Sequence, residues 1–133
     1  MKDAQLQGKG LLIVDDEEEI RKFLEFQFRR KGMNVVTAAH GQEATRILSE
    51  NPNAFQVIIS DLRMPEMNGL QVLEFVRAHA QLKHIPFIIL TGEADQQIVV
   101  QALKTGIDDI LLKPMEFATL VEKVKTVLIP RKT

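Results

Sequence analysis

The sequence predicts an α/β domain built on a doubly wound parallel sheet, and three observations support this. Five short apolar segments alternate with five longer segments that carry apolar residues at helical spacing. Several of the short segments are apolar at consecutive positions, as strands are when helices cover both faces of a parallel sheet. The length of 133 residues, with 45% hydrophobic and 26% charged residues, suits one globular domain. Together these features favour five β-α units in sequence.

The five predicted strands are short runs of aliphatic and β-branched residues. In chain order they are residues 11–14, 34–38, 55–60, 87–90 and 110–112. The longest apolar runs have four residues, whereas a membrane span needs about 20. The first ten residues are polar and lack the apolar region of a signal peptide. We therefore expect a cytoplasmic protein that does not enter a membrane.

The five predicted helices each carry an apolar face. They cover residues 17–31, 42–50, 69–80, 95–105 and 116–129. In the first helix, the face expected to be buried consists of Ile20, Phe23, Leu24 and Phe28. Gly32 and Gly106 suit the positions that follow helix ends, and Asn68 suits the N-cap of the third helix.

The fourth predicted helix is apolar over more than one stripe. Its apolar residues are Ile98, Val99, Val100, Ala102 and Leu103. Two interpretations stay open: the helix has a wide buried face, or part of the set faces outward. Exposed apolar patches mark interaction sites, so the second interpretation predicts a partner surface on this helix.

Composition excludes several function classes. The chain has no cysteine, which excludes a disulfide scaffold, a thiolate metal site and a cysteine nucleophile. Its formal net charge of -1 gives no reason to expect direct binding to nucleic acid. All seven aromatic residues are Phe.

Polar side chains follow four of the five predicted strands. They are Asp15 and Asp16 after the first strand, Asp61 after the third, Thr91 after the fourth and Lys113 after the fifth. In open parallel sheets, sites form beyond the C-terminal ends of the strands. Three carboxylates at one edge repel one another unless a hard cation such as Mg²⁺ lies among them. The lysine and the hydroxyl suit phosphoryl oxygens, so the sequence predicts a phosphate-handling site with a carboxylate nucleophile.

Each of these residues also has a simpler explanation when taken alone. The acids Glu17–Glu19 suit the first turn of a helix, and Asp61 could be a turn residue. Thr91 could be the N-cap of the fourth helix, and Lys113 could be a solvated surface lysine. Their joint placement at corresponding strand ends favours the site.

Four segments of the chain resemble the receiver domain of two-component response regulators, in particular those similar to chemotaxis regulators. They are LLIVDDEEEIR at 11–21, VIISDLRMPEMNGLQVL at 57–73, IILTG at 88–92 and GIDDILLKP at 106–114. The resemblance covers roughly residues 9–129, and we expect residues 1–133 to form a single receiver domain. It implies a flavodoxin-like sheet with strand order 2-1-3-4-5. It also implies that Asp61 accepts a phosphoryl group from a histidine kinase or a histidine phosphotransfer protein.

The resemblance implies a Mg²⁺ site, with Mn²⁺ as the alternative ion. Asp16 and Asp61 would bind the metal directly, together with the backbone carbonyl of Arg63. Asp15 would hold it through water. Catalysis would be limited to the domain's own phosphorylation and dephosphorylation, so we do not expect a conventional enzyme.

The resemblance also implies roles around the phosphoryl group. Lys113 would pair with a phosphoryl oxygen, and with Asp61 before phosphorylation. Thr91 would move to donate a hydrogen bond to the phosphoryl group. The bond between Lys113 and Pro114 is expected to be cis, a geometry that costs little before proline.

The sequence departs from the family pattern at residue 110. Most receivers carry Tyr or Phe three positions before the lysine, and that ring turns inward on activation. Ile110 stands here, so this chain cannot use an aromatic switch at that position. The family most often binds partners through the fourth helix, fifth strand and fifth helix. We expect a downstream protein or a covalent output domain there, and a phosphorylation-dependent dimer is the further option.

Three other functions fit less well. A flavin-binding electron carrier on a flavodoxin-like sheet is the main alternative, but it needs a Ser/Thr/Gly-rich phosphate loop where this chain has DDEEE at 15–19. A haloacid-dehalogenase-type phosphatase needs an acid two positions after its nucleophile, where Arg63 stands. A receiver that signals without phosphate is not favoured, because all five expected polar residues are present.

Overall fold

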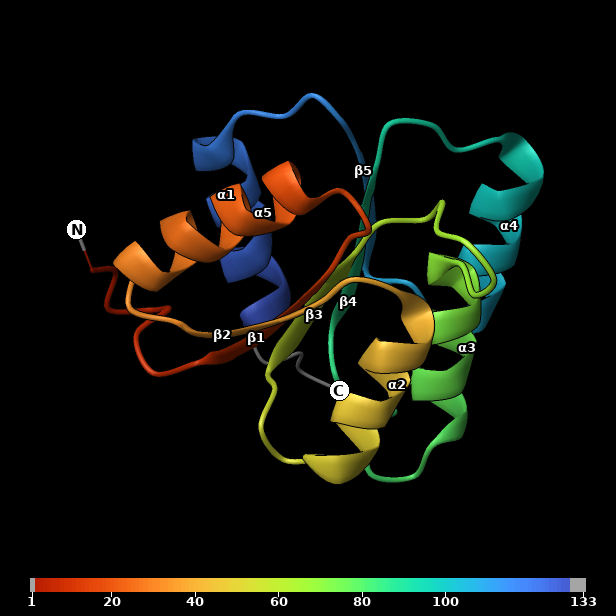
Figure 1. Cartoon of the computed structure of the whole chain (residues 1–133), viewed down its shortest axis with the longest axis horizontal. Helices are drawn as coiled ribbons and strands as arrows, with labels where there is room; N and C mark the ends of the chain where they lie inside the picture. The colour runs from red at the N-terminus through yellow and green to blue at the C-terminus, as the bar shows by residue number, and fades with distance from the viewer. Residues whose placement is uncertain (1, 130–133) are drawn as a thin grey trace.

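The computed structural model describes residues 2–129, which form a central parallel sheet between two layers of helices (Figure 1). The strands are β1 (Gly10–Val14), β2 (Asn34–Ala38), β3 (Val57–Ser60), β4 (Phe87–Thr91) and β5 (Asp109–Leu112). The helices are α1 (Glu18–Arg30), α2 (Gly41–Glu50), α3 (Gly69–Ala78), α4 (Gln96–Thr105) and α5 (Phe117–Leu128). Of the predicted domain 1–133, residues 1 and 130–133 lie outside this description.

The sheet has the strand order β2-β1-β3-β4-β5, with every neighbouring pair parallel. Helices α1 and α5 cover one face, and α2, α3 and α4 cover the other (Figure 1). Successive strand residues alternate between the two cores: Leu12 and Val14 pack beneath α2 and α3, whereas Leu11 and Ile13 pack beneath α1 and α5. The predicted doubly wound (βα)5 fold and its strand order are therefore confirmed.

All ten predicted elements are present, and each boundary agrees with its prediction within two residues. The predicted helix ends have the expected backbone: Gly32 and Gly106 have φ angles of 96° and 103°. Asn68 caps α3 and forms a capping box with Gln71. Within residues 2–129, no helix combines the length and hydropathy of a membrane span.

One prediction about a buried face is wrong, and one of the two interpretations left open for α4 is not observed. Phe23 was expected within the buried face of α1, but 52% of it is exposed, because Leu24 and Phe28 fill the core beneath the helix. The wide buried face of α4 is also not observed. Ala102 is its only fully buried residue, whereas Val100 and Leu103 are exposed. Helix α4 lies at the edge of its layer and packs mainly through one stripe, so the outward-facing interpretation holds for those two residues.

The N-terminal segment before β1 packs on the domain, which the sequence pattern did not indicate. Leu6 is fully buried in the core beneath α1 and α5. The backbone N–H of Asp3 donates to the carbonyl of Lys31 at 2.9 Å, and the Asp3 carboxylate pairs with Lys125 of α5 at 2.6 Å. The segment therefore joins the end of α1 to α5.

Candidate functional site

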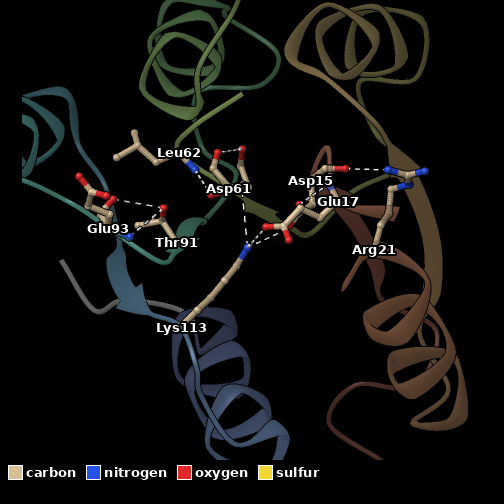
Figure 2. A network of polar contacts seen from close by, with 9 residues as sticks. Asp15, Glu17, Arg21, Asp61, Leu62, Thr91, Glu93 and Lys113 are labelled. Carbon is tan, nitrogen blue, oxygen red and sulfur yellow. Dashed lines mark hydrogen bonds and ion pairs between the residues drawn. The ribbon is translucent and has the colours of Figure 1, made fainter. Parts of the chain in front are cut away.

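The structure brings the predicted polar residues together at the C-terminal edge of the sheet (Figure 2). Asp15 follows β1 and Asp61 follows β3. Thr91 is the last residue of β4 rather than a cap of α4, since Asp95 caps that helix. Lys113 follows β5 and extends its amine between the two aspartates. This convergence results from parallel strands, whose C-terminal ends meet at one edge.

Three carboxylates form a cluster whose chemistry fits a hard divalent cation. Asp15 and Asp61 are buried and Asp16 is exposed, and one oxygen from each lies within 4.8 Å of the others. An all-oxygen set with an open, hydrated side is the arrangement that Mg²⁺ prefers in proteins. The contribution of the Arg63 carbonyl stays a prediction. The cluster therefore could hold a metal ion.

Lys113 is the cation nearest to this cluster. Its Nζ lies 3.0 Å from Oδ2 of Asp15, 3.5 Å from Oδ2 of Asp61 and 3.7 Å from Oε1 of Glu17. Asp61, the partner expected from the family resemblance, is within ion-pair range, but the short hydrogen bond goes to Asp15. The peptide bond between Lys113 and Pro114 is cis, as predicted.

Burial and charge act in opposite directions on the pKa values of this pair. Burial raises the pKa of Asp15, although the backbone N–H of Glu17 and the amine of Lys113 both stabilise its charged form. Burial alone would lower the pKa of Lys113. The hydrogen bond to Asp15 and the charges of Asp15, Asp61 and Glu17 outweigh that effect, so the Lys113 pKa is raised. The lysine is therefore protonated at neutral pH.

The backbone fixes Asp61 in place. Its N–H donates to the carbonyl of Val14 at 2.8 Å, and its Oδ1 accepts from the N–H of Leu62 at 2.7 Å. Gly69, at the start of α3, lies directly against the Asp61 carbonyl oxygen, where a Cβ atom has no room. Its N–H donates to the carbonyl of Leu62 at 2.8 Å. A glycine is therefore required here to let α3 begin against the loop that carries Asp61.

The Thr91 hydroxyl is directed toward the loop between β4 and α4, residues 92–95 (Figure 2). It is buried and donates to the carbonyl of Glu93 at 3.2 Å. Ile110, at the position where the family commonly has a ring, packs against the core beneath α2, α3 and α4. The predicted movement of Thr91 toward a phosphoryl group stays a prediction.

Sequence reasoning missed two side chains near the site, those of Glu17 and Arg21. Glu17 was grouped with the first-turn acids of a helix, yet it lies beside Lys113. Arg21 donates from Nη1 to the carbonyl of Asp15 at 2.8 Å. Arg63, whose backbone carbonyl is a predicted metal ligand, lines the same hollow of about 500 Å³ as Asp61 and Lys113. Arg21 stands one helical turn after Glu17, so helix periodicity could have indicated it.

The sequence matches a known family over most of its length. The sequence profile described as "Response regulator receiver domain" matches residues 11–125. The chain is 39% identical over 119 residues to the chemotaxis protein CheY1 of Helicobacter pylori (strain ATCC 700392 / 26695), covering 89% of this chain and 95% of that protein. It is 37% identical over 118 residues to the transcriptional regulatory protein SrrA of Staphylococcus aureus (strain NCTC 8325 / PS 47), covering 89% of this chain but 47% of that protein.

Solved structures agree with this match. The chemotaxis protein CheY4 of Vibrio cholerae superposes with a TM-score of 0.83 at 32% identity, covering 90% of this chain and 98% of that chain. A chain of the CheX-CheY-BeF3-Mg complex of Borrelia burgdorferi superposes with a TM-score of 0.85 at 26% identity, covering 93% of this chain and 92% of that chain. With the acidic cluster in the place expected for it, the chain belongs to the family of response regulator receiver domains.

Proposed function

We propose that Asp61 accepts a phosphoryl group from the phosphohistidine of a histidine kinase or a histidine phosphotransfer protein, in a Mg²⁺-dependent reaction. The observation that carries this proposal is the convergence of three carboxylates, Lys113 and Thr91 around one hollow. Membership of the receiver family also supports it. The flavin-binding alternative is disfavoured, because this chain has no Ser/Thr/Gly-rich phosphate loop after β1.

The reaction needs positioning and charge neutralisation more than it needs bond-making groups from the protein. An oxygen of the Asp61 carboxylate forms a bond to phosphorus while the P–N bond of the donor histidine breaks. The imidazole nitrogen leaves with the electron pair and takes a proton from solvent. Asp15, Asp16 and Asp61 would hold Mg²⁺, which neutralises phosphoryl oxygens when bound. Lys113, whose amine lies 3.5 Å from Oδ2 of Asp61, offsets further negative charge.

The phosphoryl group adds strong acceptor oxygens and negative charge beside Thr91. The Thr91 hydroxyl can exchange its bond to the Glu93 carbonyl for one to a phosphoryl oxygen. This exchange would alter the loop before α4. The domain acts on itself in single turnovers and is a signalling module rather than a conventional enzyme.

We propose that partners bind at the surface formed by α4, β5 and α5. Val100, Leu103 and Leu112 are exposed large apolar side chains on α4 and β5. A downstream protein, a covalently attached output domain or a second phosphorylated copy could cover them. Since Ile110 packs beneath α4, Ile110→Ala should weaken partner binding more than it lowers phosphorylation of Asp61. Equal loss of both, measured on the same preparation, would contradict this assignment.

Mass spectrometry of the intact protein tests the proposed phosphorylation. Incubation with Mg²⁺ and a small phosphodonor should add one phosphoryl group to the wild-type chain and to an Asp109→Asn control, in which the removed carboxylate lies at the start of β5. Asp61→Asn should add none, and chelation of Mg²⁺ should prevent the reaction. A phosphoryl group that persists in Asp61→Asn would refute the assignment of Asp61.

A further inference from the structure

The side chain of Arg63 connects the phosphorylation hollow to the loop that precedes α4. Its Nη2 lies 3.5 Å from Oε1 of Glu93 and 3.9 Å from Oδ2 of Asp95. The residue Arg63 lines the same hollow as Asp61, Thr91 and Lys113. A cation at the edge of the site therefore pairs with two carboxylates of the loop 92–95.

This loop determines where α4 begins. The Asp95 side chain caps the helix by accepting from the N–H of Ile98 at 2.9 Å, and its carbonyl accepts from Val99 at 3.0 Å. The carbonyl of Glu93 accepts the Thr91 hydroxyl. Arg63 and Thr91 thus hold the same short loop by two separate contacts, one to its acids and one to its backbone.

The ion pairs of Arg63 are of a kind that a stronger anion can displace. Arg63, Glu93 and Asp95 are each more than half exposed, and exposed ion pairs contribute little to stability. A phosphoryl group carries close to two negative charges and accepts charge-assisted hydrogen bonds, in which guanidinium is a preferred donor. A phosphoryl group on Asp61 would lie in the hollow that Thr91 and Arg63 also line.

We propose that Arg63 exchanges partners when Asp61 is phosphorylated, leaving Glu93 and Asp95 and pairing with the phosphoryl group. The inference rests on the proposed function and adds its regulation. Release of the two acids frees the loop 92–95 and the first turn of α4. Because this exchange needs no ring at residue 110, it gives a chain with Ile110 a second connection between the site and the α4 surface.

Binding of beryllofluoride, a phosphoryl analogue, with Mg²⁺ tests the exchange. Binding can be followed by NMR titration, because the chain has no tryptophan whose fluorescence could report it. Arg63→Ala removes the guanidinium but keeps the backbone carbonyl, and should weaken beryllofluoride binding by roughly three- to tenfold. The double substitution Glu93→Gln with Asp95→Asn removes both competing charges while Asn keeps the N-cap. It should strengthen binding several-fold.

A double-mutant cycle separates partner exchange from simple charge removal, because losing two acids favours any anion nearby. In the Arg63→Ala background, Glu93→Gln with Asp95→Asn should strengthen beryllofluoride binding by less than it does in the wild-type chain. Arg46→Ala, which removes exposed ion pairs with Glu43 and Glu50 on α2, is the matched control and should leave the affinity unchanged.

Amide hydrogen exchange provides the structural readout. The amide of Val99, which donates to the backbone carbonyl of Asp95, should exchange faster in Glu93→Gln with Asp95→Asn than in the wild-type chain without beryllofluoride. Beryllofluoride should add little further change. Two results would overturn the exchange while leaving the proposed function intact. In the first, Glu93→Gln with Asp95→Asn strengthens beryllofluoride binding equally with Arg63 and with Ala at residue 63. In the second, this double substitution weakens binding, as Arg63→Ala does. Failure of the wild-type chain to bind Mg²⁺ and beryllofluoride would overturn both.

Discussion

The two edges of the sheet each hold a cluster of charged side chains, and the clusters differ in the balance of their charges. At the N-terminal edge, Arg77 of α3 pairs with Asp108 before β5 at 2.9 Å, with each side chain less than a fifth exposed. At the C-terminal edge, Lys113 lies within 4 Å of the carboxylates of Asp15, Glu17 and Asp61, and Asp16 clusters with the two aspartates. The first cluster pairs one cation with one anion, whereas the second has an excess of anions.

The Arg77 cluster is also saturated with hydrogen bonds. The guanidinium donates to the carbonyl of Gly106 at 2.9 Å and to the carbonyls of Ile85 and Lys83 at 2.6 and 3.2 Å. Asp108 accepts from the backbone N–H of Phe87 at 2.7 Å as well. These bonds join α3 to the segments that precede β4 and β5. A satisfied, balanced network of this kind stabilises a particular backbone arrangement.

The contrast separates a cluster whose charges satisfy each other from a cluster whose charges are unbalanced. Burial raises the pKa of Asp15, so its ionised form costs the folded state free energy that the Lys113 contact does not fully offset. Arg77 and Asp108 satisfy each other, but the site carboxylates leave an excess of negative charge that a metal ion could neutralise. Charge removal should therefore have opposite effects on stability at the two edges.

The largest expected effect is at the balanced edge. Arg77→Met should lower the free energy of unfolding by about 3–5 kcal/mol, because it leaves a partly buried carboxylate and three carbonyls without their donor. Urea denaturation measures the change. Arg46→Met, which removes only exposed ion pairs on α2, should cost less than about 0.5 kcal/mol. Similar costs for both variants would show that the Arg77 network is not a stabilising element.

A smaller effect of opposite sign is expected at the site. In the absence of divalent ions, Asp15→Asn should raise the free energy of unfolding by about 1 kcal/mol, since it removes one of three mutually repelling carboxylates. Saturating Mg²⁺ should then raise the melting temperature of the wild-type chain more than that of the variant. Destabilisation by Asp15→Asn without metal would mean that its pair with Lys113 outweighs the repulsion.

The sequence predicts the site well because strand ends alone determine which residues meet. Asp15, Asp61, Thr91 and Lys113 each follow or end a strand, and parallel order then places them at one edge. The Arg77 network was not predicted, because an arginine in the last turn of a helix is ordinary and its acceptors are carbonyls whose positions depend on tertiary structure.

Apolar periodicity predicts helices more reliably than it predicts which of their side chains are buried. Phe23 falls at the edge of its helical stripe and packs edge-on against Phe117 of α5, with centroids 6.3 Å apart, while staying half exposed. Leu6 is a lone apolar residue in a polar segment, so no pattern indicates its burial. Its position follows from contacts of the N-terminal segment with α1 and α5.

The smallest expected effect concerns that segment and its balanced, half-buried pair, Asp3 and Lys125. The hydrogen bond from Lys125 lowers the pKa of Asp3, and the same contact raises the pKa of Lys125. A lowered carboxyl pKa contributes stability above the unfolded value near 3.8, which is lost as pH falls through the folded value. A raised amine pKa contributes stability that is lost as pH rises through its folded value above 10.5.

Asp3→Asn should therefore lower the melting temperature slightly at pH 7 and by less near pH 3. Lys123→Gln, whose amine lies 3.9 Å from Asp109, serves as the exposed control. If the melting temperatures of the wild type and Asp3→Asn differ by the same amount at both pH values, the carboxylate is not responsible. The role of Asp3 would then belong to its backbone hydrogen bond with Lys31.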